Sequence, residues 1–156
     1  MEDIKHAQII FRFYSELFEK EMEETLWAFE LDKENRLYQI DSIPFYVSLI
    51  ASNDIVFADY DAATKQLVYN KTISHSGHST IQVILADESK EIEDLRKIFA
   101  NFKCVSEKVN DTFFVMDIPD DVDYAPIKAK LDILEAEEVI EYAEPSLSDI
   151  HREQTS

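Results

Sequence analysis

Residues 80–143 read TIQVILADESKEIEDLRKIFANFKCVSEKVNDTFFVMDIPDDVDYAPIKAKLDILEAEEVIEYA, and the order of patterns in this stretch decides the fold. The stretch opens with a nearly continuous apolar run, Ile81–Leu85, which is typical of a strand buried on both faces. Apolar residues then recur at helical spacing twice, first after Ser89, a suitable N-cap, and again after Pro126. Two strand-like runs separate these helices and a third follows them. The resulting order, β-α-β-β-α-β, predicts a ferredoxin-like unit.

Each of the two helices is expected to bury one apolar face. The second is expected to begin near Asp123, and the apolar faces consist of Ile92, Leu95, Phe99 and Phe102 in the first helix and Tyr124, Ile127, Leu131 and Leu134 in the second. Asn110-Asp111 tolerates positive φ, which predicts a tight hairpin between strands at 104–109 and 112–118. Pro145 is expected to stop the last strand, 139–143, because proline lacks an amide donor.

The residues before position 80 contain about five strand-like runs and no convincing helix. These runs are Gln8–Tyr14, Thr25–Leu31, Arg36–Asp41, Asp54–Tyr60 and Gln66–Ile73. They predict an antiparallel β unit, either a curled sheet or a small barrel, over residues 1–79. The fold class is therefore α+β, with the ferredoxin-like unit over 80–145 and a polar tail, 146–156, that is expected to fray. The alternative is one compact domain.

The charge of the chain restricts the kind of partner that it binds. The sequence contains 33 acidic and 15 basic residues, which gives a formal net charge of −18. Such a charge repels nucleic-acid phosphate and anionic membrane surfaces and favours cationic partners. No apolar run approaches the ~18 residues of a spanning helix. With a single cysteine and an acidic N-terminus, these features predict a cytoplasmic protein that binds neither nucleic acid nor membrane.

Glycine is nearly absent, since Gly77 is the only one in the chain. Phosphate-binding loops need several glycines at fixed spacing so that backbone amides can reach the anion. The sequence therefore excludes P-loop and dinucleotide-binding fingerprints, and we expect no cofactor and no enzymatic activity.

The segment that joins the two halves is the one most like a site, because it concentrates hydroxyl groups, two histidines and the glycine: His75, Ser76, Gly77, His78 and Thr80. Nucleophilic catalysis also needs an oriented base and an oxyanion hole, and no nucleophile elbow is present. Ligand binding is one hypothesis. The structural interpretation is that Gly77 supplies an unusual backbone conformation or a close approach, while Ser76 and Ser79 bond to backbone and His78 bonds across the junction. We favour the structural interpretation.

Metal binding has weak support in the sequence. His75 and His78 would need a third ligand, such as Asp59 or Asp87, to form a zinc site. The aspartates at 117–123 lack the spacing, central glycine and final glutamate of a calcium loop. We expect no metal.

The acidic runs are either solvated faces or a docking surface for a basic protein. The first run comprises Asp87, Glu88, Glu91, Glu93 and Asp94, and the second Glu135, Glu137, Glu138, Glu141 and Glu144. The candidate docking residues are Asp117, Asp120, Asp121, Asp123, Glu137, Glu138 and Glu141. The aromatic residues Trp27, Phe45 and Tyr46 are expected in the core.

Several segments resemble a bacterial family that is known as an uncharacterised domain of unknown function. They are Glu24-Thr25-Leu26-Trp27-Ala28, Tyr38–Tyr46 with its Ile-Pro-Phe-Tyr end, Asn53–Val56, Ser76-Gly77-His78-Ser79-Thr80 and Glu141–Pro145. The resemblance covers roughly residues 9–147. It implies a cytoplasmic bacterial protein without an assigned activity. A looser similarity to toxin-neutralising immunity proteins rests on size, acidity and the lack of catalytic motifs.

These observations favour an acidic cytosolic binding protein of the immunity type, which covers a basic partner such as a nuclease toxin. The alternative is a small-ligand or regulatory module that uses the junction around His78.

Overall fold

The computed structural model describes residues 5–16 and 18–156. The chain forms two compact units, Met1–Ser76 and Gly77–Ser156, called unit 1 and unit 2 below. Unit 1 is a curled antiparallel β structure, and unit 2 combines a second antiparallel sheet with helices. The predicted α+β class is confirmed. In the described part of the chain, no helix is long and apolar enough to cross a membrane.

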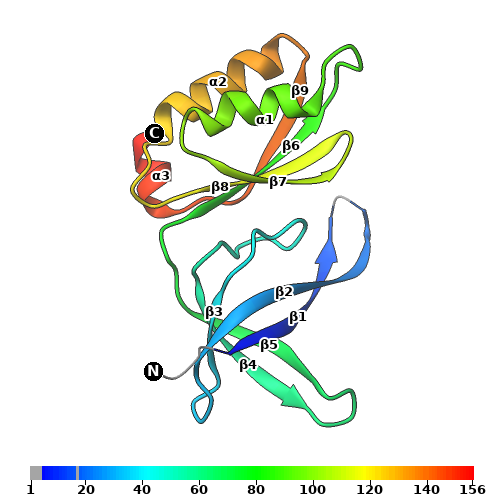
Figure 1. Ribbon diagram of the computed structural model, residues 1–156, viewed down its shortest axis with the longest axis vertical. Coiled ribbons are helices and arrows are strands. Elements are labelled where there is room, and N and C mark those ends of the chain that lie inside the picture. Colours follow the sequence, from blue (N-terminus) through cyan, green and yellow to red (C-terminus); the bar gives the residue numbers. More distant parts are fainter. Residues whose placement is uncertain (1–4, 17) are drawn as a thin grey trace. The chain divides into compact units, whose positions relative to one another are not determined.

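Unit 1 is a five-stranded closed barrel (Figure 1). Its strands are β1 (His6–Ser15), β2 (Lys20–Asp32), β3 (Leu37–Ile40), β4 (Ile55–Asp61) and β5 (Gln66–Ser74). Consecutive strands pair antiparallel, so the first and fifth strands run in the same direction. The barrel therefore closes with a short parallel pair, in which Ile9 faces Leu67 and Ile10 faces Val68.

Alternation along the strands decides which side chains fill the barrel. Leu26 and Ala28 point inward and are buried, whereas Trp27 between them is 47% exposed. The prediction that Trp27 belongs to the core was wrong, because successive side chains of a strand point to opposite faces. Phe45 and Tyr46 are partly buried. Strand β2 also starts five residues earlier than expected, since the polar residues from Lys20 pair with β1.

Unit 2 is the predicted ferredoxin-like arrangement. Its elements are β6 (Ser79–Leu85), α1 (Ile92–Ala100), β7 (Val105–Asn110), β8 (Phe113–Ile118), α2 (Ala125–Ala136), β9 (Ile140–Ser146) and α3 (Asp149–Gln154). The sheet order is β7-β8-β6-β9, with every pair antiparallel. Helices α1 and α2 lie side by side on one face of this sheet (Figure 1).

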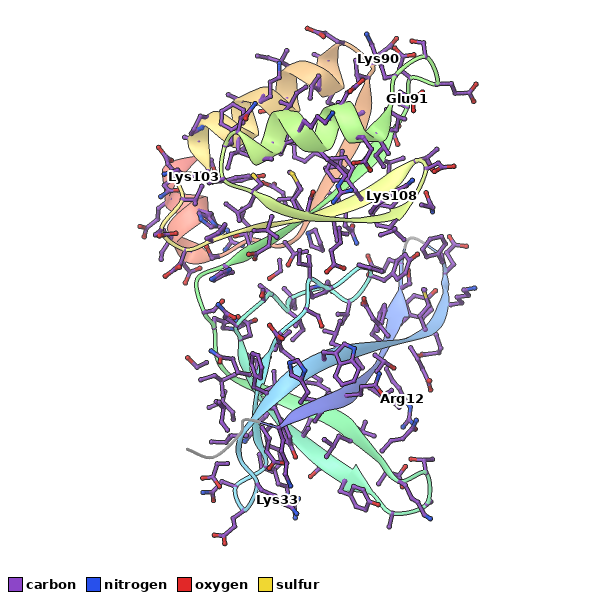
Figure 2. The ribbon with its side chains drawn as sticks, viewed as in Figure 1. Arg12, Lys33, Lys90, Glu91, Lys103 and Lys108 are labelled. Atoms are coloured by element: carbon purple, nitrogen blue, oxygen red, sulfur yellow. The ribbon has the colours of Figure 1, made fainter. Side chains whose placement is uncertain are left out.

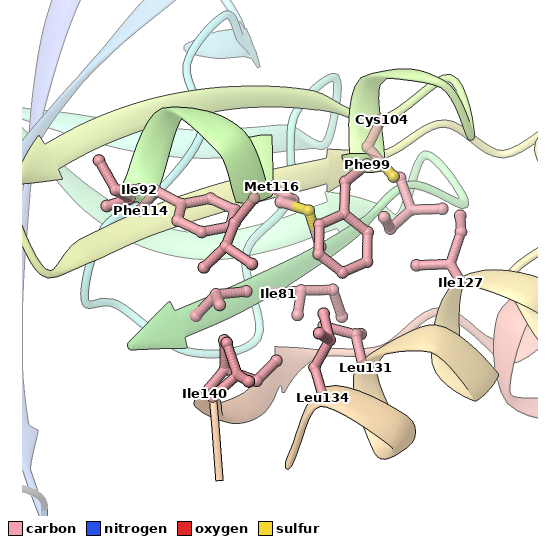
Figure 3. Close-up of a cluster of buried hydrophobic side chains, with 14 of the residues drawn as sticks. Ile81, Ile92, Phe99, Cys104, Phe114, Met116, Ile127, Leu131, Leu134 and Ile140 are labelled. Atoms are coloured by element: carbon pink, nitrogen blue, oxygen red, sulfur yellow. The ribbon is translucent and has the colours of Figure 1, made fainter. Parts of the chain in front are cut away.

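The core of unit 2 lies between these helices and the sheet (Figure 3). The two predicted apolar helix faces contribute to it, with Ile92, Leu95 and Phe99 buried and Phe102 partly buried on the first. On the second face, Tyr124, Ile127 and Leu131 have no exposed surface and Leu134 is 6% exposed. The helical spacing thus identified the packed faces correctly, because a 3.6-residue period leaves one stripe toward the sheet.

Two local predictions in unit 2 were wrong. Helix α1 begins at Ile92, and Ser89 is bonded to Asp87 in the preceding turn instead of capping the helix. Strand β6 is not buried on both faces throughout, since Ile84 is 38% exposed. The predicted hairpin at Asn110-Asp111 is confirmed, although neither residue adopts positive φ. The Asn110 side chain accepts the amide of Thr112 there.

Pro145 does not stop β9, which continues to Ser146. Thr80 of β6 pairs with Ser146 and Gln82 pairs with Ala143, so three steps along β9 match two along β6. This bulge places Pro145 where the ladder requires no amide donor.

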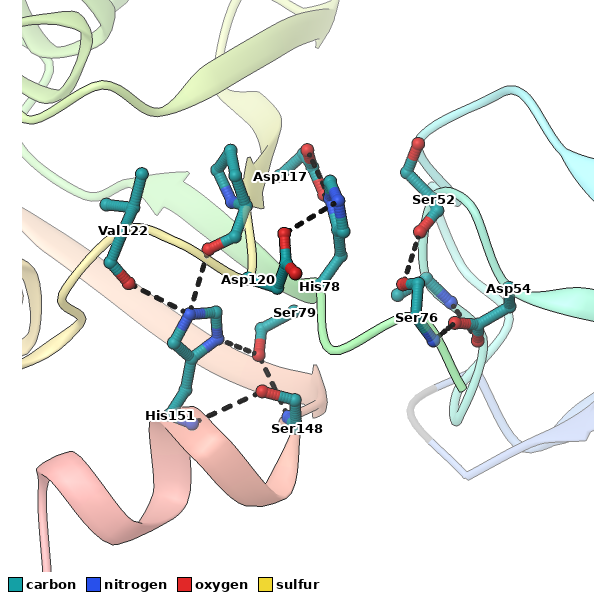
Figure 4. A network of polar contacts seen from close by, with 12 residues as sticks. Ser52, Asp54, Ser76, His78, Ser79, Asp117, Asp120, Val122, Ser148 and His151 are labelled. Carbon is teal, nitrogen blue, oxygen red and sulfur yellow. Dashed lines mark hydrogen bonds and ion pairs between the residues drawn. The ribbon is translucent and has the colours of Figure 1, made fainter. Parts of the chain in front are cut away.

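The C-terminal residues are ordered, which corrects the predicted frayed tail. Helix α3 buries His151 completely (Figure 4). The Nε2 of His151 lies 3.0 Å from the carbonyl oxygen of Pro119 and 3.1 Å from that of Val122, so it donates its proton to these acceptors. In the neutral ring Nδ1 then accepts the hydroxyl of Ser79 at 2.6 Å. A single buried histidine therefore ties the end of the chain to β6 and to the β8–α2 loop.

Replacing His151 with Ala should destabilise unit 2 by about 2–4 kcal/mol, because it opens a cavity and removes the hydrogen bonds of the imidazole with one hydroxyl and two carbonyl groups. All helices of the described chain lie in unit 2, so urea unfolding followed by circular dichroism at helix wavelengths reports on this unit. The control is Arg152→Ala, whose side chain is 64% exposed. Equal unfolding midpoints for the two variants would contradict the assigned role of His151.

Cys104 is buried in the core of unit 2, and burial raises the pKa of its thiol from 9.0 to about 12, with a smaller contribution from Asp117. The thiolate is the reactive form, so its population at pH 8 should fall roughly a thousandfold relative to an unperturbed thiol. We expect very slow reaction with a disulfide reagent in the native protein and rapid, complete reaction in denaturant. Fast native labelling would show that the thiol is accessible.

Candidate functional site

The longest connection in unit 1, residues 41–54 between β3 and β4, is held in place by two carboxylates, one for each half. Glu24 of β2 accepts the amides of Phe45 at 2.6 Å, Tyr46 at 3.0 Å and Val47 at 2.9 Å. Three successive amides converging on one anion form a backbone nest. Charge-assisted bonds of this kind are stronger than those between neutral groups, so Glu24 fixes the first half of the loop.

Asp54 fixes the second half of the same loop. Its carboxylate is 1% exposed and accepts the amides of Ala51 at 3.0 Å and Ser76 at 2.8 Å. The hydroxyl of Ser76 donates to the carbonyl of Ser52 at 2.7 Å, and Nδ1 of His75 lies 3.6 Å from Asp54. Ser76 thus bonds to backbone as the structural interpretation predicted. Its role here is to anchor the loop.

His78 lies in unit 2 between two aspartates (Figure 4). Its Nδ1 is 3.0 Å from both carboxylate oxygens of Asp117, and its Nε2 is 3.7 Å from Asp120. The imidazole is 13% exposed and the Asp117 side chain 8%. Burial raises the pKa of the Asp117 carboxyl, and the neighbouring His78 opposes this shift. The pair joins the start of β6 to the end of β8 within unit 2.

Gly77 has both features that the sequence predicted. Its φ is +93°, and a Cβ built on it would lie 2.9 Å from Cβ of Asp120. Any other residue would meet both backbone strain and a steric clash at this position. The glycine therefore permits the close approach of the chain to the β8–α2 loop.

The structure divides the predicted junction segment between two local networks. His75 and Ser76 belong to the loop network of unit 1, whereas His78 and Thr80 belong to unit 2, where Thr80 pairs with Asp117 across the sheet. The side chains of Ser79 and His151 are in direct contact at 2.6 Å, and neither is exposed. A buried pair without access for a substrate serves the fold instead of nucleophilic catalysis.

The proposed third metal ligands have other partners. Asp59 binds Arg36 at 2.8 Å and Asn70 at 2.7 Å. Asp87 accepts hydrogen bonds from the backbone amide and the hydroxyl of Ser89. Across residues 5–16 and 18–156, no group of three or more potential ligands is placed to hold a metal ion.

The candidate docking carboxylates do not form one patch. Asp117 is buried, so it cannot belong to a docking rim, and this assignment is corrected. Asp120, Asp121 and Asp123 lie just before α2, and the group at Glu137 lies just after it. Twelve helical residues separate the two groups by about 18 Å. A surface contact would therefore use one end of α2 or the other.

The tertiary structure joins the two acidic runs at the C-terminal end of α2. The carbonyl of Val139 accepts the amides of Ala86 at 2.8 Å and Asp87 at 3.2 Å, which brings the β6–α1 turn against the α2–β9 turn. Figure 2 shows Lys90 and Glu91 in the first of these turns. We call the resulting cluster the acidic end. It contains one basic residue, Lys90, and the exposed residues Glu88, Glu91, Glu135, Glu137, Glu138 and Glu141.

Negative side chains surround the C-terminal end of α2, where the helix dipole favours positive charge. The amide of Glu138 bonds to the carbonyl of Glu135 and that of Val139 to Leu134, which is the Schellman pattern. The position that usually holds glycine is Glu138, at φ +61°. Helix α1 ends in the same way, but there Lys103 occupies the equivalent position at φ +69°. A helix C-terminus favours cations, so α1 complements its dipole and α2 opposes it.

Sequence reasoning missed Glu24, Asp54 and His151. Glu24 and Asp54 hold the β3–β4 loop through contacts with residues more than 20 positions away, and no local sequence pattern reveals such contacts. Glu24 and Asp54 do lie inside segments that carry the family resemblance, and their position in these segments was the one feature of the sequence that could have identified them. His151 had only its apolar neighbour Ile150 to suggest a helix.

Comparison with known proteins places these residues in a family. The match to the family described as Domain of unknown function (DUF4265) covers residues 24–142. A solved structure described as a hypothetical protein from Neisseria gonorrhoeae is similar over 94% of this chain and 99% of that chain, with a TM-score of 0.79 and 21% identity. At this identity the similarity concerns the fold. No curated protein matches the sequence.

Replacing Glu24 with Gln should destabilise unit 1 by about 1–3 kcal/mol. The glutamine side chain carries no charge, and its NH₂ group would face backbone N–H groups that need an acceptor. The only tryptophan of the chain lies in β2, so its fluorescence during urea unfolding reports on unit 1. Glu23→Gln is the matched control, because the exposed pair of Glu23 with Arg12 should contribute little. Equal urea midpoints for Glu24→Gln and Glu23→Gln would contradict the role of Glu24 in holding the loop.

Proposed function

Because the chain belongs to the DUF4265 family, whose description gives no activity, we propose its function from its own geometry: it is a binding protein that uses carboxylates to engage a cationic protein partner. The observation that carries this proposal is the acidic end of unit 2, where glutamates surround a helix terminus that favours positive charge.

The stability of the fold does not explain these glutamates. Each like charge at a helix C-terminus costs a few tenths to about 1 kcal/mol. Helix α2 has no basic residue in its last turn, and Glu138 also adopts a left-handed conformation that glycine would adopt more easily. Functional sites commonly contain residues that lower stability, because function and stability can require different residues. A cationic partner would convert this repulsion into an attraction.

Part of the remaining acidity has a structural use. In turns and loops, six carboxylates accept backbone amides: Glu24, Asp32, Asp54, Asp61, Asp87 and Asp123. Unit 2 still has 19 acidic and 8 basic residues, a formal charge of −11. The negative potential is therefore concentrated in the unit that contains the acidic end.

The mechanism is electrostatic and steric. A strongly negative unit attracts a cationic surface over a distance of about 10 Å at moderate salt, and the glutamates then cover basic groups of the partner. No covalent bond is made or broken. In its most specific form the partner is a nuclease toxin, whose phosphate-binding groups the glutamates would occupy, so that the protein acts as an immunity-type inhibitor. The geometry favours no ligand site at His78, whose two ring nitrogens both face carboxylates.

The double substitution Glu137→Lys with Glu138→Lys should slow association with the partner by about tenfold at low salt, because it reverses the charge at the proposed contact. The partner is first identified by mass spectrometry of proteins retained from the native host at low salt and released at high salt, and rates are then measured by stopped flow. The same substitution should slightly raise the stability of unit 2, since lysine complements the helix dipole.

The matched control is Asp120→Lys with Asp121→Lys, which changes the net charge equally at the other end of α2. Equal slowing by both double variants would mean that only the overall charge matters, which contradicts a contact at the acidic end. An association rate that neither variant changes, or binding that is insensitive to salt, would remove the proposed function.

A further inference from the structure

The loop between β3 and β4 holds a leucine out into solvent. Leu49 is 72% exposed, more than any other large apolar side chain described, and its φ is +66°. Its neighbours in the loop are buried: Ile43 and Val47 are each 7% exposed, Ile50 2% and Ala51 1%. The loop therefore packs its apolar residues on both sides of Leu49, the one large apolar residue that it exposes.

Both features of Leu49 oppose folding. A branched side chain in the left-handed region is strained, and a leucine in water gains nothing from burial. Glycine or asparagine would relieve the strain, and the same loop uses asparagine at Asn53, φ +70°. Strain of this kind persists only where the surrounding structure imposes it, and it concentrates at binding and active sites.

The loop is fixed before any partner arrives. Glu24 and Asp54 together accept five backbone amides, and all but the one from Ser76 come from the loop. A side chain presented on a rigid loop loses little entropy on binding, which is the condition for a high-affinity anchor.

The hairpin tip that packs on this loop is acidic. Phe18, at the tip of the β1–β2 hairpin, packs edge to face on Tyr46 of the loop with ring centroids 6.0 Å apart. The tip is thereby held beside the loop, and it contains the exposed glutamates Glu16, Glu19 and Glu21 with one basic residue, Lys20. Phe18 itself is 49% exposed. The loop thus presents an exposed apolar side chain, and the hairpin tip packed on it presents exposed glutamates. An apolar centre with a polar rim is the common arrangement of a protein–protein contact.

We infer that Leu49 is the affinity anchor of a protein-binding surface formed by loop 42–53 and the β1–β2 hairpin tip. The partner presents an apolar pocket large enough for one leucine side chain, within a cationic rim that faces the glutamates of the tip. The inference rests on the proposed function for the positive charge of the partner. It adds a separate surface in unit 1, which determines how long the complex lasts, whereas the acidic end determines how fast it forms.

The first test needs no partner. Leu49→Gly should leave the melting temperature of unit 1 unchanged or raise it, because glycine relieves the left-handed strain. The comparison is Leu26→Gly, which removes a buried side chain and should lower the melting temperature clearly. If Leu49→Gly also lowers it clearly, Leu49 serves the fold and the inference is wrong.

The second test asks whether position 49 touches the partner. A photoreactive amino acid is placed at position 49 and, as a matched control, at position 31, where Leu31 is 47% exposed on β2. In the native host, position 49 should cross-link to a basic protein and position 31 should not. The captured protein is then purified, and Leu49→Ala should weaken its affinity at least tenfold through faster dissociation, with Leu31→Ala close to the unsubstituted protein.

The outcomes separate this inference from the proposed function. Equal cross-linking at the two positions, capture of no protein, or capture of an acidic protein at position 49 overturns the inference. Dissociation that Leu49→Ala leaves unchanged, with association still slowed by the Glu137→Lys and Glu138→Lys pair, removes the inference and leaves the proposed function intact. If the Glu137→Lys and Glu138→Lys pair leaves association unchanged while Leu49→Ala still speeds dissociation, the proposed contact at the acidic end is wrong and Leu49 remains the anchor.

Discussion

Backbone amides outside helices and strands need acceptors, and in this protein carboxylates provide them. The clearest case is Glu24, which accepts three successive amides and so converts a long connection into a fixed loop. Asp54 does the same at the other end of that loop. A buried amide without a partner costs about as much as a lost hydrogen bond, so these bonds determine the loop's conformation.

Because glycine is scarce, other residues must adopt the left-handed conformations that glycine usually adopts. Besides Gly77, seven described residues adopt positive φ: Glu19, Arg36, Leu49, Asn53, Lys65, Lys103 and Glu138. Each requires support from neighbouring contacts, since a side chain strains the left-handed conformation. Lys103 fits its surroundings because it lies at a helix C-terminus. Glu138 does not fit its surroundings because of its charge, and Leu49 does not because of its exposure. The two proposed binding surfaces start from these residues.

The negative charge of the chain therefore has two origins that composition cannot separate. Some carboxylates cap turns, and their charge is incidental to that role. Others lie at the end of α2 and at the tip of the β1–β2 hairpin, and among them Glu135 accepts the amide of Tyr142 in β9. These are the carboxylates of the proposed contacts. The predicted set of docking residues mixed these classes: Asp117 is buried against His78, Asp123 caps the start of α2, and only Glu137, Glu138 and Glu141 belong to the acidic end.

The sequence by itself determined the element order, the buried faces of α1 and α2, and the need for glycine at position 77. These depend on periodicity and on φ, which are local properties of the chain. Only the tertiary structure decided that Trp27 points outward, that β9 passes Pro145, that His151 orders the last helix, and that two acidic runs meet at Val139. Each of these depends on contacts between residues distant in sequence, whose free energy appears only when the chain has folded.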